Sequence, residues 1–324
     1  MTQTAKPVAI SCGEPAGIGP EIAYKAWQAI GSQVPMVWIG DPQHLPAGAV
    51  FQPVATPAEA VSICPNALPV LARDFGAPAV AAQPEPAHAS GVIDSIAAAV
   101  ELAQSGQACA VCTSPIHKAA LIDGAGFAYP GHTEFLAALT GCSDVVMMLA
   151  SDALRVVPAT IHIPLSEVPN ALTPEVLTST IMITARALQR DFGIARPRIA
   201  VAGLNPHAGE DGKMGRQEID MMVPVLDTLR AKGYDIAGPM SADTMFHEAA
   251  RSRYDVAVCS YHDQALIPIK MLDFSGGVNV TLGLPIVRTS PDHGTAFDIA
   301  GRGIADPASM IAALRMAHDM GGRA

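Results

Sequence analysis

The sequence predicts an α/β protein with largely parallel sheet and helices on both faces. Short apolar runs alternate with helical patterns along almost the whole chain, which is the order that parallel strands with helical crossovers produce. Of the 324 residues, 50% are hydrophobic but only 5% are aromatic, and such an aliphatic core suits buried parallel strands. The 28 glycines and 27 prolines keep the apolar runs short, and none approaches the roughly 18 residues that a membrane span needs.

The individual elements follow from local signals. Proline in a first turn and Thr or Asp at a cap predict helix starts at Pro20, Thr173 and Asp306. The helix over residues 217–232 is expected to kink at Pro224. No repeat or linker divides the chain, so any second domain is intertwined with the first. The expected strands are residues 7–12, 34–40, 108–113, 145–150, 199–203 and 256–260, and the other expected helices are residues 90–104, 133–139, 173–192 and 307–320.

The charge balance limits the classes of partner. Thirty acidic and twenty basic side chains give a net charge of -10, so we expect neither nucleic acid nor an anionic membrane as a partner. An anionic small substrate then requires a local basic cluster. The first residues lack the apolar centre of a signal peptide, and the six cysteines mostly lie in apolar runs, as reduced thiols would. We therefore expect a cytoplasmic protein.

Polar residues gather in loops after the expected strands, where open α/β sheets bind ligands. The first such loop, residues 13–21, reads Gly-Glu-Pro-Ala-Gly-Ile-Gly-Pro-Glu and leads into a helix N-terminus that could receive an anion. It is not GxGxxG, and no Gly-Lys-Ser/Thr follows it. A structural turn and a ligand loop are both open, and a nicotinamide cofactor would have to bind without the usual fingerprint.

Three histidines share a setting behind apolar runs. His162 follows a Val/Ala run, whereas His207 and His262 come after the strands expected at residues 199–203 and 256–260. Three imidazoles with an open position suit a catalytic divalent metal. A single histidine in such a place is more often a hydrogen-bonded structural residue than a ligand. The shared position of the three at strand ends brings the metal interpretation level with the structural one, so both stay open.

Two further groups indicate an anion site. His132 and Thr133 lie where a helix is expected to start, so backbone donors and the helix dipole favour an anion there, with Thr133 as a simple N-cap the alternative. Lys270, Asn279 and Arg288 fall in a largely apolar stretch, where a substrate phosphate or carboxylate would supply a partner. A structural ion pair is the alternative for the two cations.

Six segments between Gly13 and Gly301 are specific in combination. They are GEPAGIGPEI, GHTEFLA, LNPHAGEDGKMGRQE, GPMSADT, YHDQALIPIK and GVNVTLGLPIVRTSPDHGTAFDIAG. With them the chain resembles the 4-hydroxythreonine-4-phosphate dehydrogenase family of pyridoxal phosphate biosynthesis. The stretch from His293 to Ala296 is also similar to a loop of isocitrate and isopropylmalate dehydrogenases, which bind NAD without a Rossmann fingerprint.

The resemblance implies a fold and an assembly. The fold is two intertwined α/β/α domains with a cleft between them, like isocitrate and isopropylmalate dehydrogenases. Residues 1–125 with 270–324 are expected to form the first domain, and residues 126–269 the second, which carries the metal ligands and dimer contacts; both boundaries are approximate. The resemblance also implies a homodimer whose active site lies at the interface, with the metal shared between subunits.

The implied activity is oxidation of 4-phosphooxy-L-threonine at its secondary hydroxyl by NAD (or NADP), followed by decarboxylation to 3-amino-2-oxopropyl phosphate. The metal ligands carried over by motif are His162, His207 and His262, for one zinc, magnesium, manganese or cobalt ion per site. The substrate-binding positions are His132, Thr133, Lys270, Asn279 and Arg288. The expected cofactor-binding positions are Asp292, His293, Gly294 and Thr295.

The identity of the catalytic base and the identity of the substrate both stay open. Asp243 and Asp263 are candidates for the base, and each also suits a supporting role beside a metal ligand. The main alternative substrate is threonate or erythronate 4-phosphate, because the motifs do not separate an amino group from a hydroxyl at the neighbouring carbon. A binding protein without metal is disfavoured by the three histidines, and a metal-dependent hydrolase is disfavoured if residues 291–298 hold adenosine.

Overall fold

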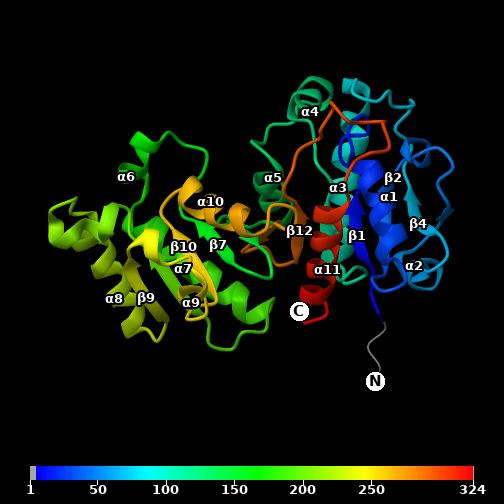
Figure 1. Ribbon diagram of the computed structural model, residues 1–324. Helices are drawn as coiled ribbons and strands as arrows, with labels where there is room; N and C mark the ends of the chain where they lie inside the picture. The colour runs from blue at the N-terminus through cyan, green and yellow to red at the C-terminus, as the bar shows by residue number, and fades with distance from the viewer. Residues whose placement is uncertain (1–4, 324) are drawn as a thin grey trace. The chain divides into compact units, whose positions relative to one another are not determined.

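The computed structural model describes residues 5–323, which form two compact units (Figure 1). The first unit holds the chain up to Ser143 and from Leu284 onward, and the second is Asp144–Gly283. The sequence places these boundaries near residues 125 and 269. The chain leaves the first unit once and returns to it, and the predicted α/β class is confirmed.

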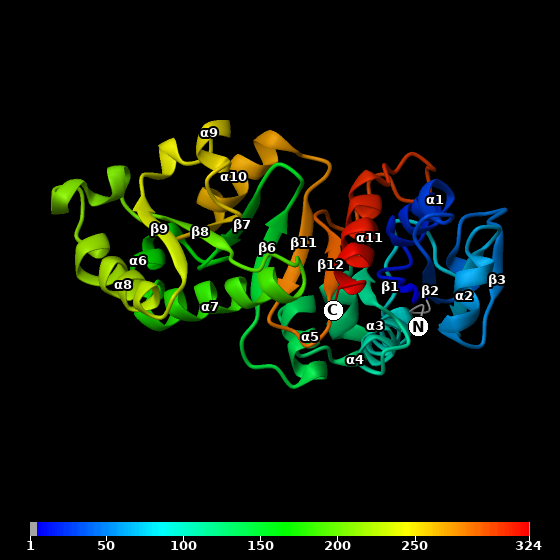
Figure 2. The ribbon, with the colours of Figure 1, turned by 90° about the horizontal axis from the view of Figure 1, so that it is seen from below.

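The first unit has a parallel sheet in the order β3-β4-β2-β1-β5-β12. Helix α11 packs on β12 and β5 with α1 beside it, and α3 covers the other face at β1 and β5 (Figure 2). Because helices lie on both faces, every residue of β1 and β2 is buried. The strands are Val8–Ser11 (β1), Met36–Gly40 (β2), Phe51–Pro53 (β3), Leu68–Ala72 (β4), Ala110–Thr113 (β5) and Arg288–Pro291 (β12). The α-helices are Gly19–Ile30 (α1), Pro57–Ile63 (α2), Ala89–Gln104 (α3), Lys118–Ala125 (α4), His132–Thr140 (α5) and Ala308–Gly321 (α11), with 3-10 turns at Pro42–His44 and Pro86–His88.

The second unit has a mixed sheet in the order β11-β6-β7-β10-β8-β9. Strand β6 runs antiparallel to both β11 and β7, whereas β7, β10, β8 and β9 are parallel neighbours. The link from β6 to β7 is too short for a helical crossover, so these two strands must be antiparallel. The strands are Val146–Ala150 (β6), Arg155–Pro158 (β7), Arg198–Ala202 (β8), Asp235–Met240 (β9), Val256–Cys259 (β10) and Val278–Leu282 (β11). The α-helices are Val168–Ala171 (α6), Pro174–Arg190 (α7), Val223–Ala231 (α8), Glu248–Arg251 (α9) and His262–Leu272 (α10), with 3-10 turns at Leu165–Glu167, Pro206–Gly212 and Ala242–Thr244.

The observed helix starts can be compared with the capping and proline signals in the sequence. Thr173 caps α7 as predicted, since its side chain accepts a hydrogen bond from Val176 N at 3.3 Å. The helix expected over residues 217–232 is irregular just before Pro224. A π-helical turn at Glu218–Met222 leads directly into α8, and Pro224 lies in the first turn of α8. No helix within residues 5–323 is both long and apolar enough to cross a membrane.

Gly124 in α4 tests how tightly the first unit is packed. A Cβ at this position would lie 1.9 Å from Pro86 O and 2.7 Å from Ala89 Cβ. Gly124→Ala should therefore lower the free energy of unfolding by about 2 kcal/mol, because the backbone at Pro86 and the start of α3 at Ala89 cannot move freely. Urea denaturation of the variant measures this loss.

Gly322→Ala is the matched control. Its Cβ would meet only His318 O at 3.4 Å and Asp319 O at 3.9 Å, which are ordinary contacts. This variant should unfold within about 0.5 kcal/mol of the unchanged protein. Equal losses for the two substitutions would contradict the packing argument.

Candidate functional site

The three histidines of the second unit come from one edge of its sheet. His162 lies in the loop after β7, His207 in the loop after β8, and His262 is the first residue of α10, just after β10. Strands β7, β10 and β8 are parallel neighbours, so their carboxyl ends meet at the same edge. The topology therefore brings together loops that are far apart in the sequence.

Two of these imidazoles lie close together. The ring centroids of His162 and His262 are 5.7 Å apart, and His262 Nδ1 is 2.7 Å from Asp263 Oδ1, which leaves Nε2 for another ligand. A cavity of about 290 Å³ adjoins both rings, and its other lining residues include Thr160, Leu165 and Tyr261. Within residues 5–323, no three His, Cys, Asp or Glu side chains lie near enough to hold one metal ion. A single chain thus gathers two of the three predicted ligands.

The backbone is strained at two of the histidines. His162 has φ +52° and His207 has φ +51°, in the left-handed region that non-glycine residues rarely adopt. Positive φ continues from His207 to Asp211. Glu218 supports this turn, because its carboxylate accepts hydrogen bonds from Asn205 N at 2.8 Å and Asn205 Nδ2 at 2.9 Å. Such strain costs of order 1–3 kcal/mol per residue and clusters at functional sites.

The two base candidates have different surroundings. Asp243 is exposed and accepts a hydrogen bond from Ser241 Oγ at 2.5 Å; this bond, followed by a smaller effect of His207, lowers the pKa of the carboxyl. Asp263 is bonded to His262. A depressed pKa weakens a general base, so the position of Asp243 favours a supporting role.

Lys270 and Asn279 also belong to the second unit. Lys270 lies in the last turn of α10, with Nζ 5.1 Å from the ring centroid of Phe274. Asn279 is the second residue of β11, and its Oδ1 is buried with no hydrogen-bond partner among the described residues. A buried amide oxygen without a partner is costly, so Asn279 is open to a ligand donor.

Two polar residues of the first unit, Arg288 and His132, interact electrostatically. Arg288, the first residue of β12, is 3% exposed, and its Nη2 donates to Thr113 Oγ1 at 2.6 Å. Burial lowers the pKa of Arg288 to about 10, so it remains charged at neutral pH. Burial, and then the nearby charge of Arg288, lowers the pKa of His132 well below its usual value. His132 is partly exposed as a residue, but its Nε2 is buried and has no hydrogen-bond partner within residues 5–323.

Thr133 follows His132 in the first turn of α5. The alternative that Thr133 is the N-cap is wrong, since Gly131 occupies that position and no side chain caps the helix. The free N–H groups of this turn accordingly remain available to an anion.

The predicted cofactor loop, residues 292–295, contacts the Gly/Pro loop of residues 13–21. Thr295 O accepts a hydrogen bond from Ile18 N at 3.0 Å, and a Cβ on Gly17 would lie 2.9 Å from the same oxygen. Asp292 N donates to Ser309 Oγ at 3.2 Å, while His293 Nε2 is buried without a hydrogen-bond partner in the part of the chain that the structure describes. Gly294 has open space where a Cβ would stand.

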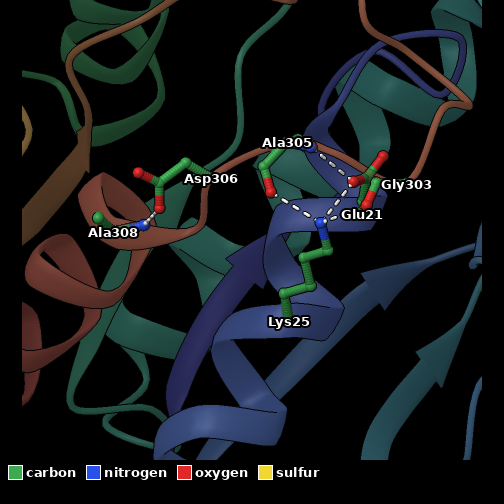
Figure 3. Close-up of polar contacts among 6 residues, drawn as sticks. All are labelled: Glu21, Lys25, Gly303, Ala305, Asp306 and Ala308. Atoms are coloured by element: carbon green, nitrogen blue, oxygen red, sulfur yellow. Dashed lines mark hydrogen bonds and ion pairs between the residues drawn. The ribbon is translucent and has the colours of Figure 1, made fainter.

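The first unit has a cavity of about 550 Å³ that is lined by Gly17, Gly301 and Gly303. Gly17 is also the residue that approaches Thr295 O of the predicted cofactor loop. The wall of the cavity is held by the Glu21–Lys25 pair (Figure 3). Lys25 Nζ donates to Glu21 Oε1 at 2.8 Å and to the carbonyls of Gly303 and Ala305 at 3.0 and 2.8 Å, and Ala305 N donates to Glu21 Oε1 at 2.9 Å. The pair thereby fixes the turn that follows the predicted cofactor loop.

The sequence reasoning missed two buried polar residues near these loops. Glu14 is 2% exposed and accepts from Ala16 N at 3.1 Å, and burial raises its pKa. Thr113 ends β5 and binds Arg288. A polar residue at the end of a buried strand was the available signal for Thr113, but its partner is 175 residues away.

These observations define one candidate site in each unit of an α/β protein. In the second unit, His162 and His207 have left-handed backbone at strand ends, and in the first unit the buried cation Arg288 acts on His132, the first residue of α5. Convergent polar groups of this kind mark a site for a small polar ligand.

Comparisons with known proteins identify the family. Residues 32–317 match the family described as "Pyridoxal phosphate biosynthetic protein PdxA". The chain is 61% identical over 320 residues to the 4-hydroxythreonine-4-phosphate dehydrogenase of Ruegeria sp. (strain TM1040), covering 99% of this chain and 98% of that protein. It is also 61% identical to the enzyme of that name from Paracoccus denitrificans (strain Pd 1222), with both chains covered completely. The crystal structure of the Klebsiella pneumoniae 4-hydroxythreonine-4-phosphate dehydrogenase matches with a TM-score of 0.89 and 38% identity, over 98% of this chain and 99% of that one. The chain belongs to the PdxA family, which confirms the resemblance, and it is an oxidoreductase.

The lowered pKa of His132 predicts a pH dependence of stability. In the unfolded chain this histidine has a pKa near 6.5, whereas the folded value is lower. The unfolded state therefore binds more protons as the pH falls below 6.5, and the free energy of unfolding must fall. Between about pH 7.5 and about pH 5.5, the free energy of unfolding measured in urea should fall less in His132→Asn than in the unchanged protein. The difference should be below about 1.4 kcal/mol per pH unit.

His44→Asn provides a comparison, because burial also lowers the pKa of His44. Each variant should remove its own share of the pH dependence, and the double variant should remove both shares. An unchanged pH dependence in His132→Asn would show that this imidazole is not buried neutral.

Proposed function

We propose that the chain oxidises 4-hydroxythreonine 4-phosphate at its secondary hydroxyl with NAD or NADP, in pyridoxal phosphate biosynthesis. The observation that carries this proposal is the 61% identity, over nearly the full length of both chains, to dehydrogenases named for that substrate. The buried Arg288 of the first unit supports it, because a phosphorylated substrate needs a local cation in a chain with net charge -10.

We propose that Arg288, His132 and Thr133 bind anionic groups of the substrate, together with Lys270 and Asn279. A bound anion would offset the desolvation of the Arg288 guanidinium, and the free N–H groups of α5 suit phosphate oxygens. The Asn279 Oδ1 atom would accept a hydrogen bond from a substrate hydroxyl or ammonium group. The Arg288 charge, the Asn279 amide oxygen and the N–H groups of α5 would thus make complementary contacts with the substrate.

The donor set suits a divalent metal. We propose that His162, His207 and His262 hold one ion (zinc, magnesium, manganese or cobalt), with Asp263 orienting His262 through the 2.7 Å contact to Nδ1. Since one chain gathers only two of the imidazoles, the set would be completed between two copies. When bound, the ion lowers the pKa of a coordinated hydroxyl and stabilises negative charge on its oxygen.

The cofactor loop is the second part of the proposal. We assign NAD or NADP to residues 292–295, where the Thr295 carbonyl is fixed by Ile18 and His293 Nε2 is free for a ligand. The cofactor supplies the hydride acceptor, and the protein supplies its orientation. A rigid loop suits this task, because hydride transfer requires close and reproducible placement.

The reaction that these groups would support has two stages. Removal of the hydroxyl proton and of a hydride from the same carbon gives a 2-amino-3-oxo acid phosphate. That β-keto acid then loses carbon dioxide and takes up a proton, leaving 3-amino-2-oxopropyl phosphate. Of the two base candidates, we propose that Asp263 supports His262 rather than accepting the substrate proton.

We propose a homodimer acting in the cytoplasm. Large apolar side chains are exposed along and just after α10, with Ile267, Met271 and Phe274 at 60%, 82% and 77% exposure. An apolar surface of this kind favours association with a second copy. The six cysteines are free thiols, as is usual in a reducing compartment.

Steady-state kinetics test the substrate. The purified protein with a divalent metal and NAD should form NADH with 4-phosphooxy-L-threonine and release carbon dioxide. Turnover of threonate or erythronate 4-phosphate without turnover of the amino acid would refute the first assignment and support the alternative. Parallel assays with NADP determine the cofactor preference.

His207→Ala tests the metal assignment. With one of three ligands removed, turnover should fall by at least about 100-fold and the protein should bind less than one metal ion per site, measured by elemental analysis after dialysis. His247→Ala, which removes an exposed histidine of the same unit, is the control and should retain both. Circular dichroism should show both variants folded. Full metal content and activity in His207→Ala would restore the structural interpretation of this histidine.

A further inference from the structure

Arg288 and Thr113 lie on the same face of the first unit's sheet. Strands β5 and β12 are parallel neighbours, and Arg288 is in register with Val111. Thr113 is two residues beyond Val111, so its side chain points to the same face. The arginine can reach it only along the strand direction, and its Nη2 does so at 2.6 Å. The contact is therefore set by strand register rather than by a flexible loop.

Both partners of this hydrogen bond are buried. Thr113 is 1% exposed and Arg288 is 3% exposed. A valine would fill the Thr113 position with nearly the same shape, so the hydroxyl contributes little as packing. A hydroxyl bonded to a buried guanidinium forms a charge-assisted hydrogen bond, which is among the stronger neutral-to-ion contacts in proteins. The feature that distinguishes Thr113 from valine is this acceptor.

The other face of strands β5 and β12 packs against helix α11. Thr289 is in register with Cys112, and its Oγ1 donates to Ala313 O of α11 at 2.9 Å. Cys112 Sγ lies 3.6 Å from Met310 Sδ of the same helix. This face therefore joins the sheet to α11, whereas the face with Thr113 and Arg288 carries the charge that acts on His132.

We propose that Thr113 is a positioning residue for substrate binding: its hydroxyl holds the Arg288 guanidinium in the orientation that receives an anionic group of the substrate. This inference rests on the proposed function of Arg288. A planar guanidinium recognises a carboxylate or phosphate through a fixed fork, so its orientation matters as well as its charge. Removing one anchor lets the fork rotate and weakens the bond to the anion without touching the reacting atoms.

Thr113→Val tests the inference on the full-length enzyme with its metal and NAD. KM for 4-phosphooxy-L-threonine, and its Kd measured by calorimetry without cofactor, should rise about tenfold, while kcat stays within about twofold. Thr113→Ser keeps the acceptor and should restore wild-type values. Thr113→Cys has nearly the shape of serine but a weak acceptor, and should behave like the valine variant.

Thr289→Val is the matched control, because it removes a buried threonine hydroxyl from the neighbouring strand on the opposite face. It should lower the melting temperature as Thr113→Val does, and should leave KM and Kd unchanged. Equal rises in KM for the two valine variants would indicate general loosening and overturn the inference. An unchanged KM in Thr113→Val and Thr113→Cys would also overturn it.

Arg288→Lys separates this inference from the proposed function. Loss of substrate affinity in Arg288→Lys with normal affinity in Thr113→Val would reject the role of Thr113 and leave that of Arg288 intact. Normal affinity in Arg288→Lys would reject both. If Thr113 acts through the arginine, Thr113→Val should add less than twofold to the effect of Arg288→Lys in the double variant.

Discussion

Parallel strand pairing is the constraint on which both candidate sites depend. Parallel neighbours end at the same edge of a sheet, so the loops that follow them converge however far apart they are in the chain. In the second unit, the order β7-β10-β8 brings the loops of His162, His262 and His207 to one edge. In the first unit, the pairing of β5 with β12 sets the register that joins Thr113 to Arg288. A different strand order would scatter these side chains without changing any element.

Both sites also contain arrangements that are unfavourable for folding alone. The left-handed backbone at His162 and His207 costs energy that Glu218 and the surrounding turn offset in the second case. The buried guanidinium of Arg288 has lost its hydration and recovers part of it through Thr113. Strain and buried charge are expected at sites proposed to bind a cation and an anion, because a bound ligand can supply the missing interactions.

The sequence predicted the parts of the structure that depend on local signals. The α/β class, the cap at Thr173 and the position of the histidines after strands follow from short patterns of apolar, capping and turn residues. The antiparallel β6–β7 pair and the Thr113–Arg288 contact could not be predicted, because they depend on pairing and register between segments. The left-handed φ of His162 could not be predicted from the sequence either, since non-glycine residues seldom adopt it and no glycine lies at that position.

The acidity of the whole chain sharpens the role assigned to the buried cation. At a net charge of -10 the protein repels a phosphorylated ligand at long range, and salt screens most of that field within about 10 Å. Binding then depends on short contacts in a water-poor site, where a fixed guanidinium interacts far more strongly than it would at the surface. Under these conditions orientation matters as much as charge, because hydrogen bonds to an anion weaken steeply when misaligned. In the proposed site, the anchor of Arg288 on β5 would for this reason contribute to recognition of the anion as well as to core packing.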